Sequence, residues 1–169
     1  MNGAVDDRGS AAGVVIRPAT REDVDGLLAF DMTVVVRTRD DWDDVIDKAS
    51  RGERLLLVAE VEGDIAAFGQ AHHLDADAVD HAPAGWFLTG VTVLPPHRRQ
   101  GLGASLTTAR LDWIAQRSDT AWYFATADNV ASIRLHSGLG FDEVSRASSI
   151  HGVTFAGGEG ILFRRSPDS

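Results

Sequence analysis

Residues 91–106, with the sequence VTVLPPHRRQGLGASL, constrain the fold of this chain more than any other segment. A β-branched run ends at two prolines, and a basic turn containing Gly101 and Gly103 then leads into an apolar pattern at helical spacing. Backbone N–H groups at glycines can approach an anion closely, and the positive end of the helix dipole points at the same place. Arg98 and Arg99 add charge there. The segment therefore predicts a phosphate-binding turn between a strand and a helix.

Two other glycine-rich phosphate motifs do not fit these residues. A dinucleotide-binding fingerprint needs a third glycine where Leu106 stands, and a P-loop needs Gly-Lys followed by Ser or Thr. A tight turn without a ligand is the remaining alternative for the two glycines. The coincidence of strand, basic turn and helix favours the phosphate site.

Apolar periodicity and turn residues predict the order of elements around this turn. Strands are expected over 14–17, 55–61, 65–71, 86–94, 121–126, 141–147 and 160–164, and helices over 20–32, around 40–46, over 102–117 and over 130–137. The polar stretch over 72–84 is expected to be a loop. This order predicts an α/β fold with a mixed sheet and helices on both faces.

Length and composition indicate one domain. The 169 residues fit a single core, and hydrophobic residues make up 44% of the chain, close to the soluble average. Residues 1–13 are small, polar and glycine-containing, so we expect a flexible tail followed by one domain over 14–169. Because no apolar run suits a membrane span or a secretory signal, we expect a cytoplasmic protein without a membrane contact.

Charge and cysteine content exclude several functions. A net charge of −9 repels a phosphate backbone, so nucleic acid is not an expected partner. Without cysteine the chain forms no disulfide, no thiolate metal site and no thioester intermediate, and no metal is expected. Any acyl transfer would have to pass directly from donor to acceptor.

A second motif lies at residues 127–141, in the segment ADNVASIRLHSGLGF. With the turn described above, this segment resembles the GNAT N-acetyltransferase superfamily, whose two motifs read Arg/Gln-x-x-Gly-x-Gly/Ala and Asn-x-x-Ala/Ser-x-x-Leu-Tyr-x-x-x-Gly-Phe. The matching residues are Arg98, Gly101 and Gly103 in the first motif, and Asn129, Ser132, Leu135, Gly140 and Phe141 in the second. The resemblance covers about 14–164 and implies the GNAT-like acyl-CoA N-acyltransferase fold, with a mixed, mostly antiparallel central sheet.

The resemblance implies an acetyl-CoA site along the two motifs. The pyrophosphate would lie on backbone amides of the turn, and the pantetheine arm would pair like an added strand with Val91 and Val93. The Val93 N–H would polarise the thioester carbonyl as an oxyanion donor. Asn129 has an equal alternative as a helix N-cap. The residues expected to contact the cofactor are Val91, Thr92, Val93, Arg98, Arg99, Gln100, Gly101, Leu102, Gly103, Ala104, Ser105, Asn129, Ser132 and His136.

His136 stands where the family commonly has the tyrosine that protonates the departing thiolate. Histidine titrates near neutrality and can donate a proton, so His136 is a candidate general acid, with packing against helix neighbours as the alternative. The strand over 86–94 carries no acid or histidine to act as a general base. Candidates from elsewhere are His72, His73, Asp75, Asp77, Asp80, His81 and Glu60, and a relayed water is a further alternative.

The function implied by the resemblance is direct transfer of an acetyl group from acetyl-CoA to a primary amine of a small molecule or peptide in a ternary complex. The alternative is a non-catalytic acyl-CoA-binding sensor of the same fold, since the strand carboxylate and the tyrosine are both missing. Residues 40–44 either start a helix or attract a cationic amine. The segment over 148–159 could line the acceptor pocket or form a homodimer contact. The residues do not name the amine.

Overall fold

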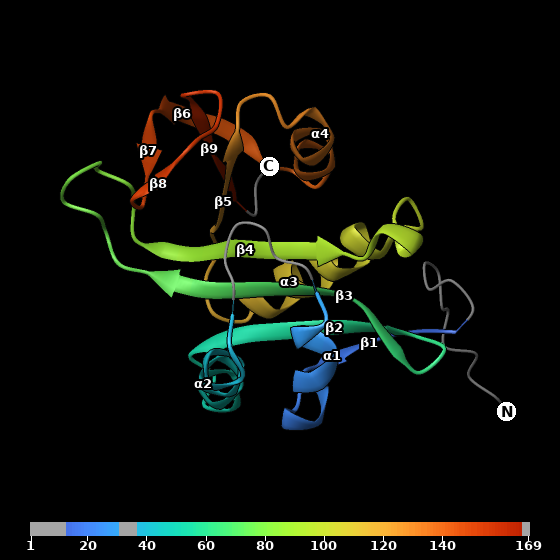
Figure 1. Cartoon of the computed structure of the whole chain (residues 1–169). Coiled ribbons are helices and arrows are strands. Elements are labelled where there is room, and N and C mark those ends of the chain that lie inside the picture. The colour runs from blue at the N-terminus through green and yellow to red at the C-terminus, as the bar shows by residue number, and fades with distance from the viewer. Residues whose placement is uncertain (1–12, 31–36, 167–169) are drawn as a thin grey trace, which may run out of the picture.

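The computed structural model of the protein describes residues 13–30 and 37–166, with a seven-stranded sheet at its centre (Figure 1). The strands are β1 (Val14–Pro18), β2 (Arg54–Val61), β3 (Asp64–Leu74), β4 (Gly85–Val93), β5 (Ala121–Thr126), β6 (Asp142–Ala147), β7 (Ser149–Ile150), β8 (Val153–Thr154) and β9 (Gly160–Arg165). The helices are α1 (Val24–Leu28), α2 (Arg39–Ser50), α3 (Leu102–Ala115) and α4 (Val130–Gly138), with 3-10 turns at Arg21–Asp23 and Pro95–His97.

The strand order is β1-β2-β3-β4-β5-β9-β6, and β7 and β8 form a separate two-stranded ribbon. Each neighbouring pair in the large sheet is antiparallel except β4 and β5, which are parallel. β1 and β6 form the two edges. The mixed, mostly antiparallel sheet predicted from the sequence is therefore confirmed.

Helices cover both faces of the sheet, which explains why β2 reads as an unbroken apolar run. Leu55 and Leu57 face a core closed by α3, which lies behind β3 and β4 in Figure 1. Leu56 and Val58 face a second core, which contains residues of α1 and the fully buried Trp42 of α2. No helix within the described residues is long and apolar enough to cross a membrane.

The first helix is shorter than predicted. Instead of one helix over 20–32, a 3-10 turn is followed by α1, which ends at Leu28. Gly26, a weak helix former, lies in the middle of α1. The predicted end near Met32, and residues 1–12 of the predicted flexible tail, lie outside the described residues.

The acidic run over 40–44 lies in α2, where it supports the start of the helix. The Thr38 N–H donates to the Asp41 carboxylate at 2.8 Å, and Thr38 Oγ1 accepts from the Asp41 N–H at 3.2 Å. This capping box satisfies backbone groups that the helix cannot pair internally, and Asp40 adds a second acid to the first turn. The structural interpretation of this acidic run is therefore confirmed.

The loop before β4 is shorter than predicted. His72, His73 and Leu74 continue the antiparallel ladder of β3 with the first residues of β4, so the loop covers only 75–84. The β7–β8 ribbon within 148–159 was not predicted. Its strands are two residues long, too short for a periodic signal in the sequence.

One ion-pair network joins β1, the first 3-10 turn and β2. The Arg17 guanidinium donates to both Asp23 carboxylate oxygens, at 2.8 and 2.7 Å, and to Glu60 at 3.0 Å. Asp23 is only 7% exposed, and it also accepts from the Thr20 N–H at 2.7 Å. The hydrogen bonds from Arg17 hold the pKa of Asp23 below its usual value of 3.8. This network fixes the entry of the chain into α1.

We expect Asp23→Asn to lower the free energy of unfolding by about 1–3 kcal/mol at pH 7, because Arg17 loses a charged, buried partner. The folded-state pKa of Asp23 is depressed, so its contribution is present above the unfolded pKa and is lost as the pH falls through the folded value. Urea unfolding at pH 7 and at pH 3 should therefore show a smaller difference between variant and parent at the lower pH.

Asp47→Asn is the matched control, because it removes a carboxylate that pairs with Arg21 on the exposed surface. Exposed pairs contribute little to stability, so this variant should unfold almost as the parent does. Equal losses in the two variants would show that the Arg17 network does not contribute more than an ordinary surface pair.

Candidate active site

The turn between β4 and α3 has the backbone of an anion site. Arg99 and Gly101 adopt positive φ angles of 62° and 83°, and Gly101 is the N-cap of α3. The first helical bond runs from the Ser105 N–H to the Gly101 carbonyl at 3.0 Å, so the N–H groups between them have no partner inside the helix. A Cβ added at Gly101 or Gly103 would meet no atom within 4 Å. The start of α3 is therefore open to a ligand.

Side chains of the turn fold back onto the end of β4. Arg98 Nε donates to the Val93 carbonyl at 3.1 Å, and Gln100 Nε2 donates to the Pro96 carbonyl at 3.4 Å. No acidic residue lies in the first turn of α3. Arg98 therefore lies in the turn, and its Nε is hydrogen-bonded to the backbone carbonyl of Val93.

β4 separates from β5 directly before this turn, and Figure 1 shows the two strands diverging. In the described part of the chain, only Trp86 and Phe87 of β4 pair with β5. The Leu94 N–H donates to β3, to the carbonyl of Ala66 at 2.9 Å. Because successive residues of a strand point their backbone groups to opposite sides, those of Val91 and Val93 are directed away from β3. The central strand is therefore splayed from β5, and Val91 in the separated part is 39% exposed.

A β-bulge at Gly90 lies in the part of β4 that is separated from β5. Gly69 of β3 pairs with Val91, whereas Gln70 pairs with Thr89, so Gly90 is the extra residue, with a φ of 48°. This conformation favours glycine. The bulge lies three residues beyond Phe87, the last residue of β4 that pairs with β5.

Arg110 of α3 contacts the bulge from the face of the sheet that α3 covers. Its guanidinium is 1% exposed and donates to the Gln70 carbonyl at 2.9 Å, the Thr89 carbonyl at 3.3 Å and Thr107 Oγ1 at 2.9 Å. Burial lowers its pKa to about 10, so it stays charged at neutral pH. A Cβ at Gly69 would come within 3.0 Å of Arg110 Nε, so this glycine provides the space. Arg110 was not among the predicted site residues. The signal that could have found it is the spacing of Leu102, Leu106 and Arg110, which places all three on one side of α3.

The second motif forms the start of α4. Asn129 is exposed, and its side chain accepts from the Ser132 N–H at 3.3 Å, as the N-cap alternative requires. Ser132 Oγ is hydrogen-bonded to the Tyr123 hydroxyl, a partner on β5 that the sequence did not reveal. Ser132 is thus engaged with Tyr123, whereas the Asn129 side chain is exposed at the start of α4.

His136 is buried inside α4 and is 1% exposed. Its ring stacks on Tyr123 with 3.5 Å between centroids and 1° between planes. Nδ1 lies 2.8 Å from the Ser132 carbonyl, which can only accept, so the proton of the neutral ring is on Nδ1. Nε2 is buried without a hydrogen-bond partner in the described residues, and burial lowers the ring's pKa to about 4. This geometry favours packing over proton donation.

Of the seven candidate general bases, His72 lies next to the bulge. Its Nδ1 is hydrogen-bonded to Thr89 Oγ1 at 2.9 Å, and burial, followed by two nearby arginines, lowers its pKa to about 4. Glu60 is engaged with Arg17. The others lie outside this region: His73 contacts Trp86 and Asp75, Asp77 and Asp80 accept from loop N–H groups, and Asp75 and His81 are exposed.

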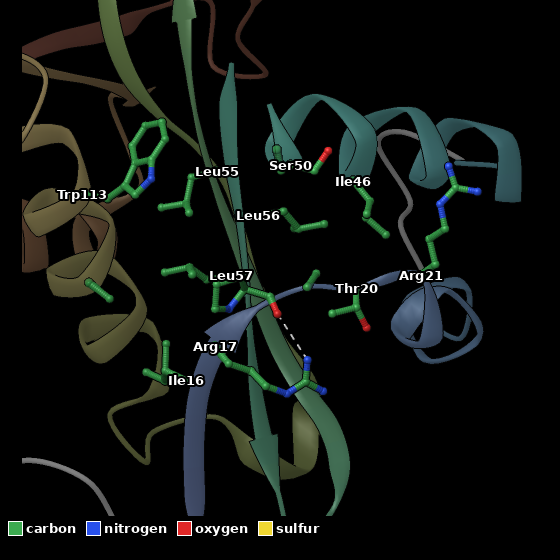
Figure 2. Close-up of a pocket in the computed structure, with 14 residues that line it drawn as sticks. Ile16, Arg17, Thr20, Arg21, Ile46, Ser50, Leu55, Leu56, Leu57 and Trp113 are labelled. Atoms are coloured by element: carbon green, nitrogen blue, oxygen red, sulfur yellow. Dashed lines mark hydrogen bonds between the residues drawn. The ribbon is translucent and has the colours of Figure 1, made fainter. Parts of the chain in front are cut away.

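The described residues also form a pocket of about 530 Å³ beside the end of β1 (Figure 2). Its walls are mostly apolar and include Ile46 of α2, Leu56 of β2 and Trp113 of α3. Arg17 lines it but is held by the network described above and by the Pro18 carbonyl. The pocket contains none of the predicted site residues, because it lies along the second half of α3, away from the turn. No group of three or more metal-ligating side chains is found in the described ranges.

Comparisons with known proteins agree on one family. Residues 22–141 match the family model described as acetyltransferase (GNAT) family. The chain is 31% identical over 106 residues to the [ribosomal protein bS18]-alanine N-acetyltransferase of Escherichia coli (strain K12), covering 62% of this chain and 66% of that protein. It is 38% identical over 71 residues to aminoglycoside N(6')-acetyltransferase type 1 of Acinetobacter haemolyticus, covering 41% and 48%.

Solved structures show the same fold. The putative acetyltransferase yncA from Salmonella typhimurium, solved with its cofactor acetyl-CoA, aligns with a TM-score of 0.69 and 19% identity over 91% of this chain and 94% of that chain. The matched segments span between 17% and 66% of the lengths of the curated relatives.

The low pKa values of His72 and His136 should be visible in solution. We expect NMR titration to show both rings neutral at pH 6, because burial disfavours the charged imidazole. Between pH 6.5 and 4 the unfolded chain binds more protons than the folded one, so stability should fall as the pH falls through this window. His136→Phe should make that fall shallower in urea unfolding. A titration midpoint for His136 near 6.5 would contradict this account of its burial.

Proposed function

Because the chain belongs to the acetyltransferase (GNAT) family, we propose that it transfers an acetyl group from acetyl-CoA directly to a primary amine of a small molecule or peptide. The proposal is supported chiefly by the part of β4 beyond Phe87, which pairs with no strand on the β5 side in the described residues and leads into the open start of α3. Such an edge can pair with the amide groups of a pantetheine arm, and the helix start can bind its pyrophosphate. The two sites lie in the order in which these groups follow one another in acetyl-CoA.

The residues present fit this cofactor. Backbone N–H groups over 101–104, with the charge of Arg98 and Arg99, would hold the pyrophosphate, and Gly103 gives it room to approach. Val91 and Val93 would pair with the pantetheine arm, and Asn129 would contact the arm from α4. The Salmonella typhimurium neighbour, which has the same fold, is named as an acetyl-CoA complex and supports this assignment.

Acetyl transfer requires few side-chain groups. The amine nitrogen attacks the thioester carbonyl, the C–N bond forms, the C–S bond breaks, and the thiolate takes up a proton while the amine loses one. The Val93 N–H would donate to the developing oxyanion, a role typically worth about 2.7–4 kcal/mol. An amine that arrives neutral can release its proton to water or to the neutral His72.

A non-catalytic acyl-CoA sensor is the second candidate. It is favoured by the proton position on His136 and by the lack of an acid or histidine on β4. Turnover separates the two functions: binding of acetyl-CoA without acetyl transfer to any member of a panel of amines, peptides and aminoglycosides would favour the sensor.

Thermal unfolding with acetyl-CoA, CoA, ATP and NADH tests the cofactor before the acceptor is known. We expect acetyl-CoA and CoA to raise the melting temperature selectively, because a ligand that binds only the folded state stabilises it. Gly103→Leu should remove this rise and leave the ligand-free melting temperature nearly unchanged, since its Cβ meets no neighbour.

Gly138→Leu is the matched control for this variant. Gly138 also lies in a helix with no atom within 4 Å of an added Cβ, but it is at the end of α4. It should keep the full response to acetyl-CoA. A normal response in Gly103→Leu would refute the assigned phosphate site.

His136→Phe tests the proton donor. Phenylalanine can keep the stack on Tyr123, so if His136 only packs, we expect kcat and KM to stay within about twofold of the parent. The measurement is steady-state CoA release, with the melting temperature recorded for both proteins. A kcat at least tenfold lower at unchanged KM would assign His136 the role of general acid instead.

A further inference from the structure

A group of polar side chains lies on the face of the sheet that carries α1 and α2, beside the bulge. Arg54 of β2, His72 and Gln70 of β3 and Thr89 of β4 are neighbours in the strand register. Arg37 reaches the same place from the residues that precede α2. We call these five residues the arginine cluster.

Hydrogen bonds fix the polar wall of the arginine cluster. An Nη of Arg54 donates to Gln70 Oε1, and His72 Nδ1 bonds to Thr89 Oγ1 at 2.9 Å. The Arg37 guanidinium lies 5.1 Å from the ring centroid of the buried Trp42. In the part of the chain that the structure describes, the cluster is therefore held by packing and neutral partners, and none of its hydrogen bonds or ring contacts involves a carboxylate.

Neither of the two arginines has a carboxylate partner in the described residues. Within residues 13–30 and 37–166, neither Arg37 nor Arg54 forms an ion pair, and the Nε of each is buried without a hydrogen-bond partner. In the same ranges, arginines paired with carboxylates are Arg17, Arg21, Arg39, Arg51 and Arg146. Within these ranges, two half-buried guanidiniums without an ion-paired carboxylate require an explanation.

Within the described residues, two carboxylates act on these arginines without forming an ion pair, Asp41 on Arg37 and Asp44 on Arg54. Burial lowers the pKa of Arg54, the charge of Arg37 lowers it further, and the charge of Asp44 opposes these two effects less strongly. His72 is neutral at pH 7 and adds no negative charge. Two like charges in a partly dehydrated place raise the free energy of the folded protein. An anion bound between them would relieve that cost.

The arginine cluster lies next to the proposed reaction site. Thr89 directly precedes the Gly90 bulge, and Val91 follows it. Arg54 on β2 is two strand spacings, about 10 Å, from β4, and its guanidinium extends over β3 to Gln70. A small molecule with its amine at Val91–Val93 could place a second group at the arginines.

We propose that the acceptor is a primary amine that also carries a carboxylate or phosphate group, and that Arg37 and Arg54 bind this anionic group. The inference rests on the proposed function and narrows its substrate class. It sets this chain apart from an enzyme for polycationic amines, such as the aminoglycoside acetyltransferase to which part of the chain is similar. Two uncompensated arginines would repel such an acceptor.

Paired amines that differ only in the anionic group test the proposal. The pairs are β-alanine with β-alaninamide and phosphoethanolamine with ethanolamine, and an aminoglycoside serves as the polycation. CoA release in the presence of acetyl-CoA should give a kcat/KM at least tenfold higher for an anionic member than for its neutral partner. The first pair tests carboxylate recognition and the second tests phosphate recognition.

Variants test whether Arg37 and Arg54 cause the preference for anionic amines. Arg37→Gln and Arg54→Gln should each reduce it by at least tenfold, mainly through KM, and Arg54→Lys should retain part of it. Arg51→Gln is the matched control, because it removes the same charge from an exposed arginine that pairs with Glu53 close to β2. It should leave the preference unchanged. Equal melting temperatures with acetyl-CoA show that a variant is folded.

Direct binding separates this inference from the proposed function. Calorimetric titration of the same amines, with and without acetyl-CoA, should show binding of an anionic member and its loss in Arg54→Gln. Failure of acetyl-CoA to bind would refute the proposed function, and the titration without acetyl-CoA would still decide the inference. Neutral amines that bind or react as well as anionic ones, no binding by any anionic amine, or a preference that survives in both glutamine variants would overturn it.

Discussion

The rest of the structure depends on a short ladder, the two residue pairs that join β4 to β5. The ladders on either side of it are longer, so the halves of the sheet are connected here by the least backbone contact. Pairing with β5 ends at Phe87, and the Gly90 bulge follows three residues later in β4. The sheet therefore has an inner strand edge that β5 does not pair with beyond Phe87, and this edge leads to the N–H groups at the start of α3 that have no partner inside the helix.

Gln70 joins the two sides of this region. Its backbone carbonyl accepts from Arg110 on the α3 face, while its side-chain oxygen accepts from Arg54 on the opposite face. Arg110 is a buried charge without a carboxylate in the described structure, and carbonyls beside the bulge, together with Thr107, satisfy its donors. The geometry of β4, the position of α3 and the arginine cluster are thus coupled through one residue. We therefore expect a substitution of Arg54, Gln70 or Arg110 to alter the backbone at Val91–Val93.

The sequence predicted what depends on local pattern. The turn over 98–104 was predicted because glycines, arginines and a following helix stand together in the chain, and the order of strands and helices followed from periodicity. Arg37 and Arg54 gave no such signal, since only folding brings them together. The sequence also places His136 in the second motif. It does not show which ring nitrogen carries the proton, because that depends on the burial of the ring, its stack with Tyr123 and its bond to the Ser132 carbonyl. Arg110 was missed because a charged residue interrupts an apolar pattern.

The two outer edges of the sheet are protected in a different way from the inner one. β6 presents a row of exposed residues, among them Asp142, Glu143 and Arg146, and the last residue of β1 is Pro18. Charges and proline at an edge discourage pairing with a strand of another molecule. The inner edge of β4 carries no such protection, but β5 closes one end of it at Trp86. The protein can therefore keep an open strand edge for its own use while resisting aggregation through strand exchange.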